Sequence, residues 1–142
     1  MSKALKKIST DAAPSAIGPY SQAIVVQGNH TLVFVSGQLP IDPKTGELIQ
    51  GDIKALTKQT LDNIEAILKA SSSSLHKVVR TEVFLKDLKK DFNGMNEEYA
   101  KRFNPQSPPA RQTIQVADLP KRSPIEISCI AVCDHDESQG NL

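Results

Sequence analysis

A stretch of mostly apolar side chains at three- and four-residue spacing constrains the fold of this chain most. The spacing is that of an amphipathic α-helix of about five turns, and charged residues occupy the opposite face. Asp52 precedes the stretch as a suitable N-cap, and a run of serines at 71–74 follows it. One face of this helix must therefore pack on another element. The positions on that face are Ile53, Leu56, Thr60, Leu61, Ile64, Ile67 and Leu68.

A second helix and several strands are expected around it. Aromatic and apolar side chains recur at helical spacing between residues 92 and 103, after a polar turn at residues 87–90 and before a proline-rich segment. Runs rich in β-branched residues predict the strands. A Gly28-Asn29 turn predicts that the second and third strands form a hairpin. The expected strands are residues 6–9, 23–27, 31–35, 78–85, 110–116 and 125–132.

This order of elements predicts an α+β fold in which two helices cover one face of a sheet. The other face would then lie open. Several strands are apolar on both sides, for example residues 31–35. An open apolar face in a small protein implies that another subunit covers it. The pattern therefore predicts obligate oligomerisation.

The composition is that of one globular domain. The 142 residues are 39% hydrophobic and 23% charged, and we place the domain at residues 1–133. The tail at 134–142 is polar, lacks periodicity and is expected to be disordered. A net charge of +1 argues against strong non-specific attraction to nucleic acid or membrane. No apolar run reaches the ~18 residues of a membrane span, and the N-terminus lacks the apolar stretch of a secretory signal, so a cytoplasmic protein is expected.

Cys129 and Cys133 lie four residues apart in one expected strand. Four strand steps span roughly 13 Å, whereas a disulfide needs Cα atoms within about 7 Å. The two thiols are therefore expected not to bridge each other. Packing as small apolar residues is the simplest interpretation, because a metal site needs further ligands and the neighbouring sequence offers none.

The segment from Pro108 to Ile127 contains the strongest candidates for chemistry. Arg111 follows two prolines at the start of a strand, and its guanidinium presents a planar fork of donors that suits a carboxylate or phosphate. Glu126 lies between two isoleucines at the start of the next strand. A carboxyl group in apolar surroundings tends to have a raised pKa, which suits proton transfer. Each residue also has a plainer interpretation: Arg111 as a surface or ion-paired residue, and Glu126 as the buried partner of a cation.

Other candidates are weaker on their own. Tyr20 follows a Gly-Pro pair and could either donate its hydroxyl into a cleft or pack as a turn residue. Ser36 beside Gly37 could offer a hydroxyl and a close backbone approach, although this pair is common in turns. Asn96 alone reads as a solvated position. The sequence has no phosphate-cradling or dinucleotide-binding glycine motif, and its histidines lack the spacing of a zinc site, so chemistry here would be cofactor-free and metal-free.

Three segments carry a specific resemblance. They are residues 16–23 (Ala-Ile-Gly-Pro-Tyr-Ser-Gln-Ala), residues 35–40 (Val-Ser-Gly-Gln-Leu-Pro), and Pro-Ala-Arg at 109–111 through Ile-Glu-Ile at 125–127. Residues 42–47, 60–63 and 83–88 fit the same pattern, in order along the chain. Taken together, the segments resemble the Rid family, also called the YjgF family.

The resemblance implies a chorismate-mutase-like mixed sheet and a homotrimer with clefts between subunits. It also implies a cofactor-free deaminase that hydrolyses reactive 2-enamino and 2-imino acids, such as 2-aminoacrylate and 2-iminobutanoate, to 2-keto acids and ammonia. In that reaction Arg111 would hold the substrate carboxylate, and Glu126 would orient or activate the attacking water. The residues expected to line the cleft are Tyr20, Ser36, Gly37, Asn96 and, through its backbone, Thr113.

Departures from the family pattern follow Arg111 directly. Gln112 stands where a small residue is usual, and Thr113 replaces the cysteine common in the archetypal subgroup. The hydrolytic scheme does not need that cysteine, so these departures concern substrate range. If the strands that begin near Arg111 and Glu126 form one hairpin, the two side chains lie at its opposite ends, and a shared site needs two subunits.

Two other functions are compatible with these residues. A trimer could bind small carboxylates at Arg111 without turnover, although an acid such as Glu126 would then have little use. An endoribonuclease or translation inhibitor, an activity reported for some family members, is disfavoured by the near-neutral charge and the lack of a basic aromatic platform.

Overall fold

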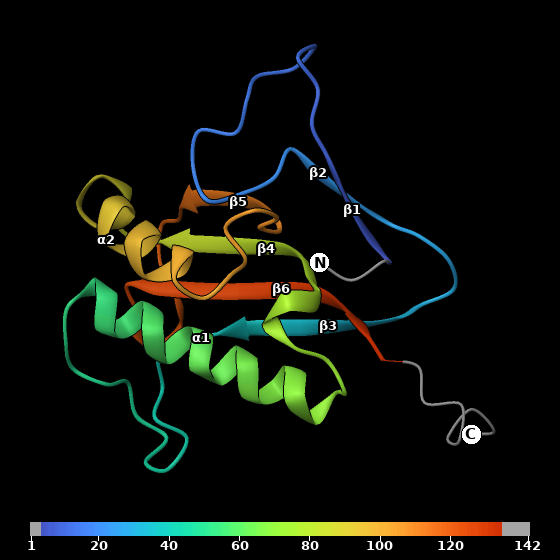
Figure 1. The fold of residues 1–142 in the computed structure, drawn as a ribbon. Helices are drawn as coiled ribbons and strands as arrows, with labels where there is room; N and C mark the ends of the chain where they lie inside the picture. The colour runs from blue at the N-terminus through green and yellow to red at the C-terminus, as the bar shows by residue number, and fades with distance from the viewer. Residues whose placement is uncertain (1–3, 135–142) are drawn as a thin grey trace.

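The computed structural model describes residues 4–134, and a four-stranded mixed sheet forms one of its two layers (Figure 1). The strand order is β3-β6-β4-β5. β4 and β5 run parallel because a helix crosses over between them, whereas β6 is antiparallel to both of its neighbours. The strands are β3 (Thr31–Gln38), β4 (Val78–Leu85), β5 (Ala110–Gln115) and β6 (Ile125–Cys133). A separate antiparallel ribbon is formed by β1 (Leu5–Ile8) and β2 (Ala23–Val26).

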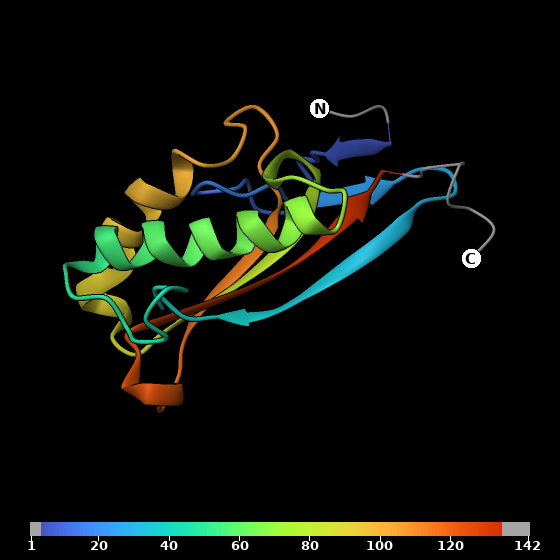
Figure 2. The ribbon, with the colours of Figure 1, turned by 90° about the horizontal axis from the view of Figure 1, so that it is seen from below.

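Both α-helices, α1 (Ile53–Ala70) and α2 (Leu88–Ala100), lie on the same face of this sheet (Figure 2). Asp52 caps α1, since its Oδ1 accepts a hydrogen bond from the Ala55 N–H at 2.9 Å. The predicted five-turn helix and its N-cap are thus confirmed. Two short 3₁₀ helices, Leu75–Lys77 and Pro120–Arg122, complete the described elements.

The core lies between the helices and the sheet. Apolar side chains of α1 pack on β3 and β6, and α2 covers the β4 side. One buried polar pair belongs to this layer: the hydroxyls of Thr81 on β4 and Tyr99 on α2 are 2.8 Å apart. Fully buried core side chains include Leu61, Ile64, Leu68, Val83, Leu85, Met95, Ile125 and Ile127.

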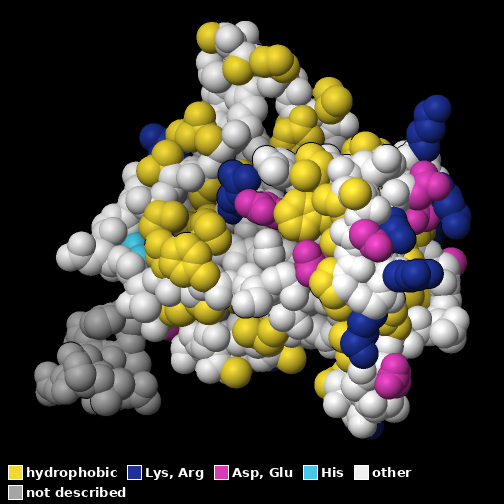
Figure 3. Space-filling view, turned by 180° about the vertical axis from the view of Figure 1, so that it is seen from behind, with side chains coloured by type: hydrophobic (Ala, Val, Ile, Leu, Met, Phe, Trp, Pro, Cys, Tyr) yellow, Lys and Arg dark blue, Asp and Glu magenta, His cyan; other side chains and the backbone are white. Residues whose placement is uncertain are grey.

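The second face of the sheet is uncovered in the described chain, as expected from the strand pattern. Phe34 on β3 is 70% exposed there, and Leu32 and Ile114 are exposed as well. Figure 3 shows hydrophobic side chains gathered over this face, with charged groups among them. An apolar surface of this kind in a folded chain marks an interaction site, and the predicted oligomer remains the simplest way to cover it.

The predicted hairpin between residues 23–27 and 31–35 is wrong. β2 pairs with β1, and β3 pairs with β6. The Gln27 N–H donates to the Ala4 carbonyl at 2.7 Å, which prolongs the β1–β2 pairing past the point where the chain should have reversed. The glycine-asparagine pair therefore connects two sheets instead of closing one hairpin.

The polar turn predicted at residues 87–90 is also wrong, because α2 begins there. The Asp87 carboxylate accepts from the Lys90 N–H at 3.0 Å and caps the helix. The polar residues that suggested a turn are the solvent side of its first turn. At the other end α2 stops at Ala100, before Phe103, whose ring packs 4.5 Å from that of Tyr99.

Two further expectations concern the C-terminal part of the chain. Cys129 and Cys133 both lie in β6 and are free thiols, as predicted. Asp134, the first residue of the expected tail, donates its N–H to the Ser72 carbonyl at 2.9 Å. The rest of the tail, for which disorder was predicted, lies outside the described residues. Within residues 4–134, neither helix has the length and apolar character needed to cross a bilayer.

Candidate active site

Arg111 lies near the start of β5, on the face of the sheet that α2 covers. Its register partner on β4 is Thr81, and the Pro108-Pro109 pair leads the chain into the strand. From there the guanidinium reaches α2, where its Nη1 donates to the Asn96 side-chain oxygen at 2.6 Å. Asn96 was expected to be solvated when considered alone. The structure instead makes it the residue that fixes the orientation of Arg111.

Two tyrosine rings flank the same guanidinium. Its central carbon is 4.9 Å from the centroid of the Tyr99 ring and 5.8 Å from that of Tyr20, within the range of cation–π attraction. Tyr99 is itself fixed by Thr81, so the ring under Arg111 belongs to the rigid core. These contacts hold the guanidinium plane in one orientation.

The charge of Arg111 is left uncompensated by the residues that the structure describes. Burial lowers the pKa of the Arg111 guanidinium, and the neighbouring Tyr99 and Tyr20 partly offset that effect, but an arginine keeps its proton in either case. Among residues 4–134, no carboxylate forms an ion pair with it. The interpretation of Arg111 as an ion-paired residue is therefore not supported by the described residues. A partly buried, unpaired cation is a site for an anion.

The loop before β2 forms one wall of this site. The Ser21 N–H donates to the Pro109 carbonyl at 3.2 Å, and its hydroxyl donates to that of Pro108, which ties the loop to the start of β5. A Cβ on Gly18 would lie 3.6 Å from Arg111 Nη2, so the loop backbone closely approaches the guanidinium. Together these elements line a cavity of about 350 Å³ that is open to solvent on one side. It is lined by Ile17, Gly18, Tyr20, Phe92, Arg111, Gln112 and Thr113.

Thr113 follows Arg111 by two residues and therefore faces the same side of β5. Its side-chain hydroxyl is buried and has no hydrogen-bond partner within the described chain. Such a group normally finds a partner, in protein or in solvent. The sequence resemblance pointed only to the backbone of Thr113, whereas the structure also places a buried, unpartnered side-chain hydroxyl at this residue of the cavity lining.

Glu126, Ser36 and Gly37 form a second group. The register between β3 and β6 shifts after Val35, so Ser36 and Gly37 form a bulge beside β6. A Cβ on Gly37 would lie 2.6 Å from Glu126 Cδ, which no real side chain could tolerate without displacement. Glycine at position 37 is thus what lets the Glu126 side chain lie against β3.

The carboxylate of Glu126 faces the open side of the sheet. Its neighbours Ile125 and Ile127 are fully buried in the helix-covered core, and successive side chains in a strand alternate between faces. Within the described residues Glu126 makes neither an ion pair nor a side-chain hydrogen bond. The alternative, a cation that pairs with a buried Glu126, is thus not found between residues 4 and 134.

The structure therefore collects the predicted site residues into two groups. Arg111, Tyr20, Asn96 and Thr113 gather at the helix-covered face, whereas Ser36, Gly37 and Glu126 gather at the open face. The premise of a single β5–β6 hairpin is wrong, because β4 lies between these strands. Arg111 is level with Thr81 and Glu126 with Phe84, on either side of β4. Within one chain the two groups therefore lie on opposite faces of the sheet.

Sequence reasoning missed two residues that shape the site. Tyr99 and Met95 belong to the aromatic and apolar spacing at residues 92–103 that predicts a packed helix face. The Tyr99 ring also supports the guanidinium, and the Met95 sulfur is 4.0 Å from Arg111 Nη1. The spacing of Asn96 and Tyr99 places both on neighbouring positions of one helix face. That spacing was the available signal.

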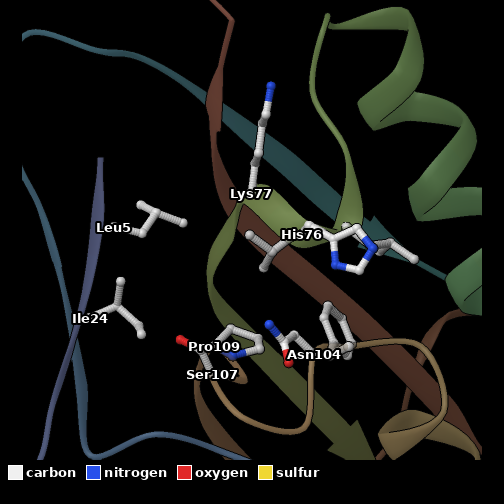
Figure 4. A pocket seen from close by; sticks show the side chains of 10 residues that line it. Leu5, Ile24, His76, Lys77, Asn104, Ser107 and Pro109 are labelled. Carbon is white, nitrogen blue, oxygen red and sulfur yellow. The ribbon is translucent and has the colours of Figure 1, made fainter. Parts of the chain in front are cut away.

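A separate cavity of about 180 Å³ lies between the β1–β2 ribbon and the core (Figure 4). Leu5 and Ile24 of the ribbon face Pro109 and Asn104 across it. Its lining contains neither an acid nor an arginine, so it lacks the chemistry of the Arg111 cavity. Across the described part of the chain, no three His, Cys, Asp or Glu side chains gather as a metal site.

Comparisons with known proteins agree with this arrangement. The family model described as Endoribonuclease L-PSP matches residues 10–133. A RutC family protein of Pyrococcus horikoshii is 53% identical over 124 residues, which are 87% of this chain and 94% of that protein. The human 2-iminobutanoate/2-iminopropanoate deaminase is 46% identical over 125 residues, 88% of either chain. The crystal structure of RidA from an Antarctic Psychrobacter superposes with a TM-score of 0.67 at 43% identity and covers 89% of this chain and 98% of its own. This chain therefore belongs to the Rid family that its motifs indicated.

Proposed function

We propose that this protein is a cofactor-free deaminase that hydrolyses 2-imino and 2-enamino acids to 2-keto acids and ammonia. One observation carries the proposal: the partly buried Arg111 guanidinium lies beside a cavity of about 350 Å³ and has no carboxylate partner in the described chain. A small carboxylic acid is the ligand that fits such a cation. The activity named for the human relative, at 46% identity, supports the same assignment.

Arg111 binds the substrate carboxylate in this scheme. Asn96 accepts from Nη1 and orients the guanidinium, and the Tyr99 and Tyr20 rings restrict its plane. The remaining N–H groups are free to donate to the two carboxylate oxygens. Binding in this way places C2 of the substrate next to the carboxylate anchor, where water must attack.

Glu126 handles the protons. As a water molecule adds to C2, the carboxylate takes a proton from the water and passes it to the imine nitrogen, which becomes an amine. Collapse of the resulting carbinolamine breaks the C–N bond and releases ammonia and the keto acid. Water is the only co-reactant, so the atoms balance without an oxidant, a reductant or a metal.

The complete site is formed between two subunits of a homotrimer in this proposal. Glu126 needs to come within hydrogen-bond reach of the substrate, but in one chain it faces the side of the sheet opposite to Arg111. The open face carries exposed Phe34 and Leu32, which a neighbouring subunit would bury. A neighbour packed there would bring one chain's Glu126 group toward another chain's Arg111 group.

The test generates the substrate in place. A threonine or serine dehydratase releases the imine, semicarbazide traps whatever remains unreacted, and keto acid and ammonia are measured with and without the protein. The wild type should accelerate keto-acid formation, Arg111→Ala should not, and Arg122→Ala, which removes another arginine from an exposed position away from the cavity, should match the wild type. Failure of a folded wild-type protein to accelerate either reaction would contradict the proposal and favour a carboxylate-binding trimer.

Endoribonuclease activity is the second candidate, because the matching family model carries that description. The net charge of +1 offers little attraction for a phosphate backbone. The same purified wild type and Arg111→Ala protein should therefore leave labelled RNA intact. Salt-sensitive cleavage that disappears in Arg111→Ala would establish the nuclease instead.

A further inference from the structure

A groove adjoins the Arg111 cavity and shares two of its walls. Its volume is about 530 Å³, and it lies between the N-terminal half of α2 and β5. Phe92 and Thr113 line both the groove and the cavity. The two spaces therefore meet at this pair of residues. The groove is lined by Leu88, Lys89, Phe92, Asn93, Thr113 and Gln115.

The chemistry of the groove suits an alkyl chain. Leu88 and Phe92 are partly buried and pack against the core, so they form a fixed apolar base. The Gln115 side-chain oxygen already accepts from the Leu88 N–H at 2.9 Å, which holds that amide in place. The lining contains no acid, and its one cation, Lys89, is exposed to solvent. Apart from this lysine at its exposed edge, the lining offers no charged group to a ligand that carries one carboxylate.

Thr113 marks the place where the two spaces join. Its buried hydroxyl has no partner among the described residues, and the residue belongs to both linings. A ligand held by its carboxylate at Arg111 that extends into the groove passes Thr113, and turning the buried hydroxyl toward the ligand would give it the partner that it lacks. In such a ligand, the polar atom nearest to Thr113 is the nitrogen or oxygen bonded to C2, the carbon next to the carboxylate.

We propose that the groove is the side-chain pocket of the Arg111 site. The substrates are then 2-imino acids with extended apolar side chains, and the Thr113 hydroxyl hydrogen-bonds the nitrogen or oxygen on C2. The class of substrate rests on the proposed deaminase function, but the binding of carboxylates with long chains does not. Binding and turnover can therefore be tested apart.

Calorimetry with straight-chain 2-oxo acids tests the pocket without any reaction. The series is 2-oxobutanoate, 2-oxopentanoate and 2-oxohexanoate, titrated into the full-length protein. Each added methylene that enters the groove should lower Kd about fourfold. Asn93→Trp fills the groove from α2 and should abolish this dependence on chain length. Lys90→Trp adds the same bulk to the same helix at an exposed position outside both linings, and should keep it.

The same titrations test the proposed hydrogen bond from the Thr113 hydroxyl, through a loss of affinity that is equal for all three acids. Thr113→Val keeps the shape and removes the hydroxyl, so it should weaken all three acids by the same factor, about tenfold for a lost hydrogen bond to a buried group. Thr113→Ser should restore the affinity. A loss that depends on chain length, or no loss at all, would contradict the assignment of the hydroxyl to C2.

The outcomes separate the pocket from the deaminase. Equal Kd values for all three acids in a protein that hydrolyses 2-iminobutanoate overturn the pocket and leave the function standing. Length-dependent binding without turnover supports the pocket and overturns the deaminase. If the Asn93→Trp variant binds 2-oxohexanoate as tightly as the wild type, the alkyl chain of the acid lies outside the groove, and the assignment of the groove as a side-chain pocket is overturned.

Discussion

Arg111 and Glu126 point from opposite faces of one sheet. The Arg111 guanidinium reaches α2 and bonds to Asn96, whereas Glu126 stands between the core residues Ile125 and Ile127 and faces the other side. Arg111 lies on β5 and Glu126 on β6, and β4 lies between these two strands. This separation is the reason to expect a site completed by a second subunit.

Asn96 should matter for substrate binding more than for the chemical step. Asn96→Ala removes the 2.6 Å bond that orients Arg111, and a hydrogen bond to a charged group is worth about 1.5–3 kcal/mol. We expect KM to rise by about tenfold or more, with a smaller effect on kcat. Steady-state kinetics in the coupled assay measures both.

Asn96→Asp provides the contrast. It keeps the oxygen but places a carboxylate against the guanidinium, so it would compete with the substrate for Arg111. Its KM should exceed that of Asn96→Ala. An aspartate variant with wild-type KM would show that Arg111 does not bind the carboxylate.

Gly37→Ala should disturb Glu126 directly. The new methyl group would stand 2.6 Å from Glu126 Cδ, and the carboxylate would have to move. We expect kcat to fall by at least about tenfold, which is less than the roughly 10²–10⁴-fold contribution of a positioned acid–base group, because the carboxylate is displaced and not removed. Because β3 is the edge strand of the sheet, thermal unfolding should change little. Unchanged kcat in a folded variant would argue that the position of Glu126 is not critical.

The Thr81–Tyr99 pair should stabilise the fold beneath the site. The two hydroxyls are 2.8 Å apart and fully buried, and burial raises the pKa of Tyr99, so its hydroxyl stays protonated. Thr81→Val leaves that hydroxyl unpaired and should lower the free energy of unfolding by about 1–3 kcal/mol. Urea denaturation measures this. The double variant Thr81→Val, Tyr99→Phe should lose less than the sum of the single variants, and full additivity would contradict a direct bond.

The two cysteines should differ in reactivity. Burial raises the pKa of the Cys129 thiol to about 12, so at pH 8 only about one part in 10⁴ is thiolate, the reactive form. Cys133 is less buried. We expect the folded protein to react with one equivalent of a thiol reagent, and Cys133→Ser to abolish that reaction while Cys129→Ser does not. Rapid reaction of Cys129 below pH 9 would mean that β6 opens.

Much of the fold follows from local pattern. The helix behind Asp52 and the strand at Val78–Leu85 have strong periodic signals, and both lie where expected. The Gly28-Asn29 hairpin failed because a local turn signal cannot show which strand edges are available elsewhere in the chain. The start of α2 was missed because a capped, solvent-facing first turn has the composition of a loop.

The site was harder to predict than the fold. The two prolines before Arg111 and the two isoleucines around Glu126 mark these residues as candidates. Neither pattern reveals the face of the sheet on which a side chain lies. That depends on strand order, which placed β4 between them. The role of Tyr99 in the site could not be predicted, because an aromatic residue on a packed helix face usually belongs to the core. Here the ring belongs to the core and also supports Arg111.

A mixed-subunit experiment tests the shared site most directly. Arg111→Ala and Glu126→Gln proteins, each inactive alone, are co-expressed with different tags, and native mass spectrometry verifies that mixed oligomers form. If each site takes Arg111 from one chain and Glu126 from the next, random assembly of a cyclic oligomer restores about one quarter of wild-type activity. Mixed oligomers that remain as inactive as the parent variants would contradict a site shared between subunits.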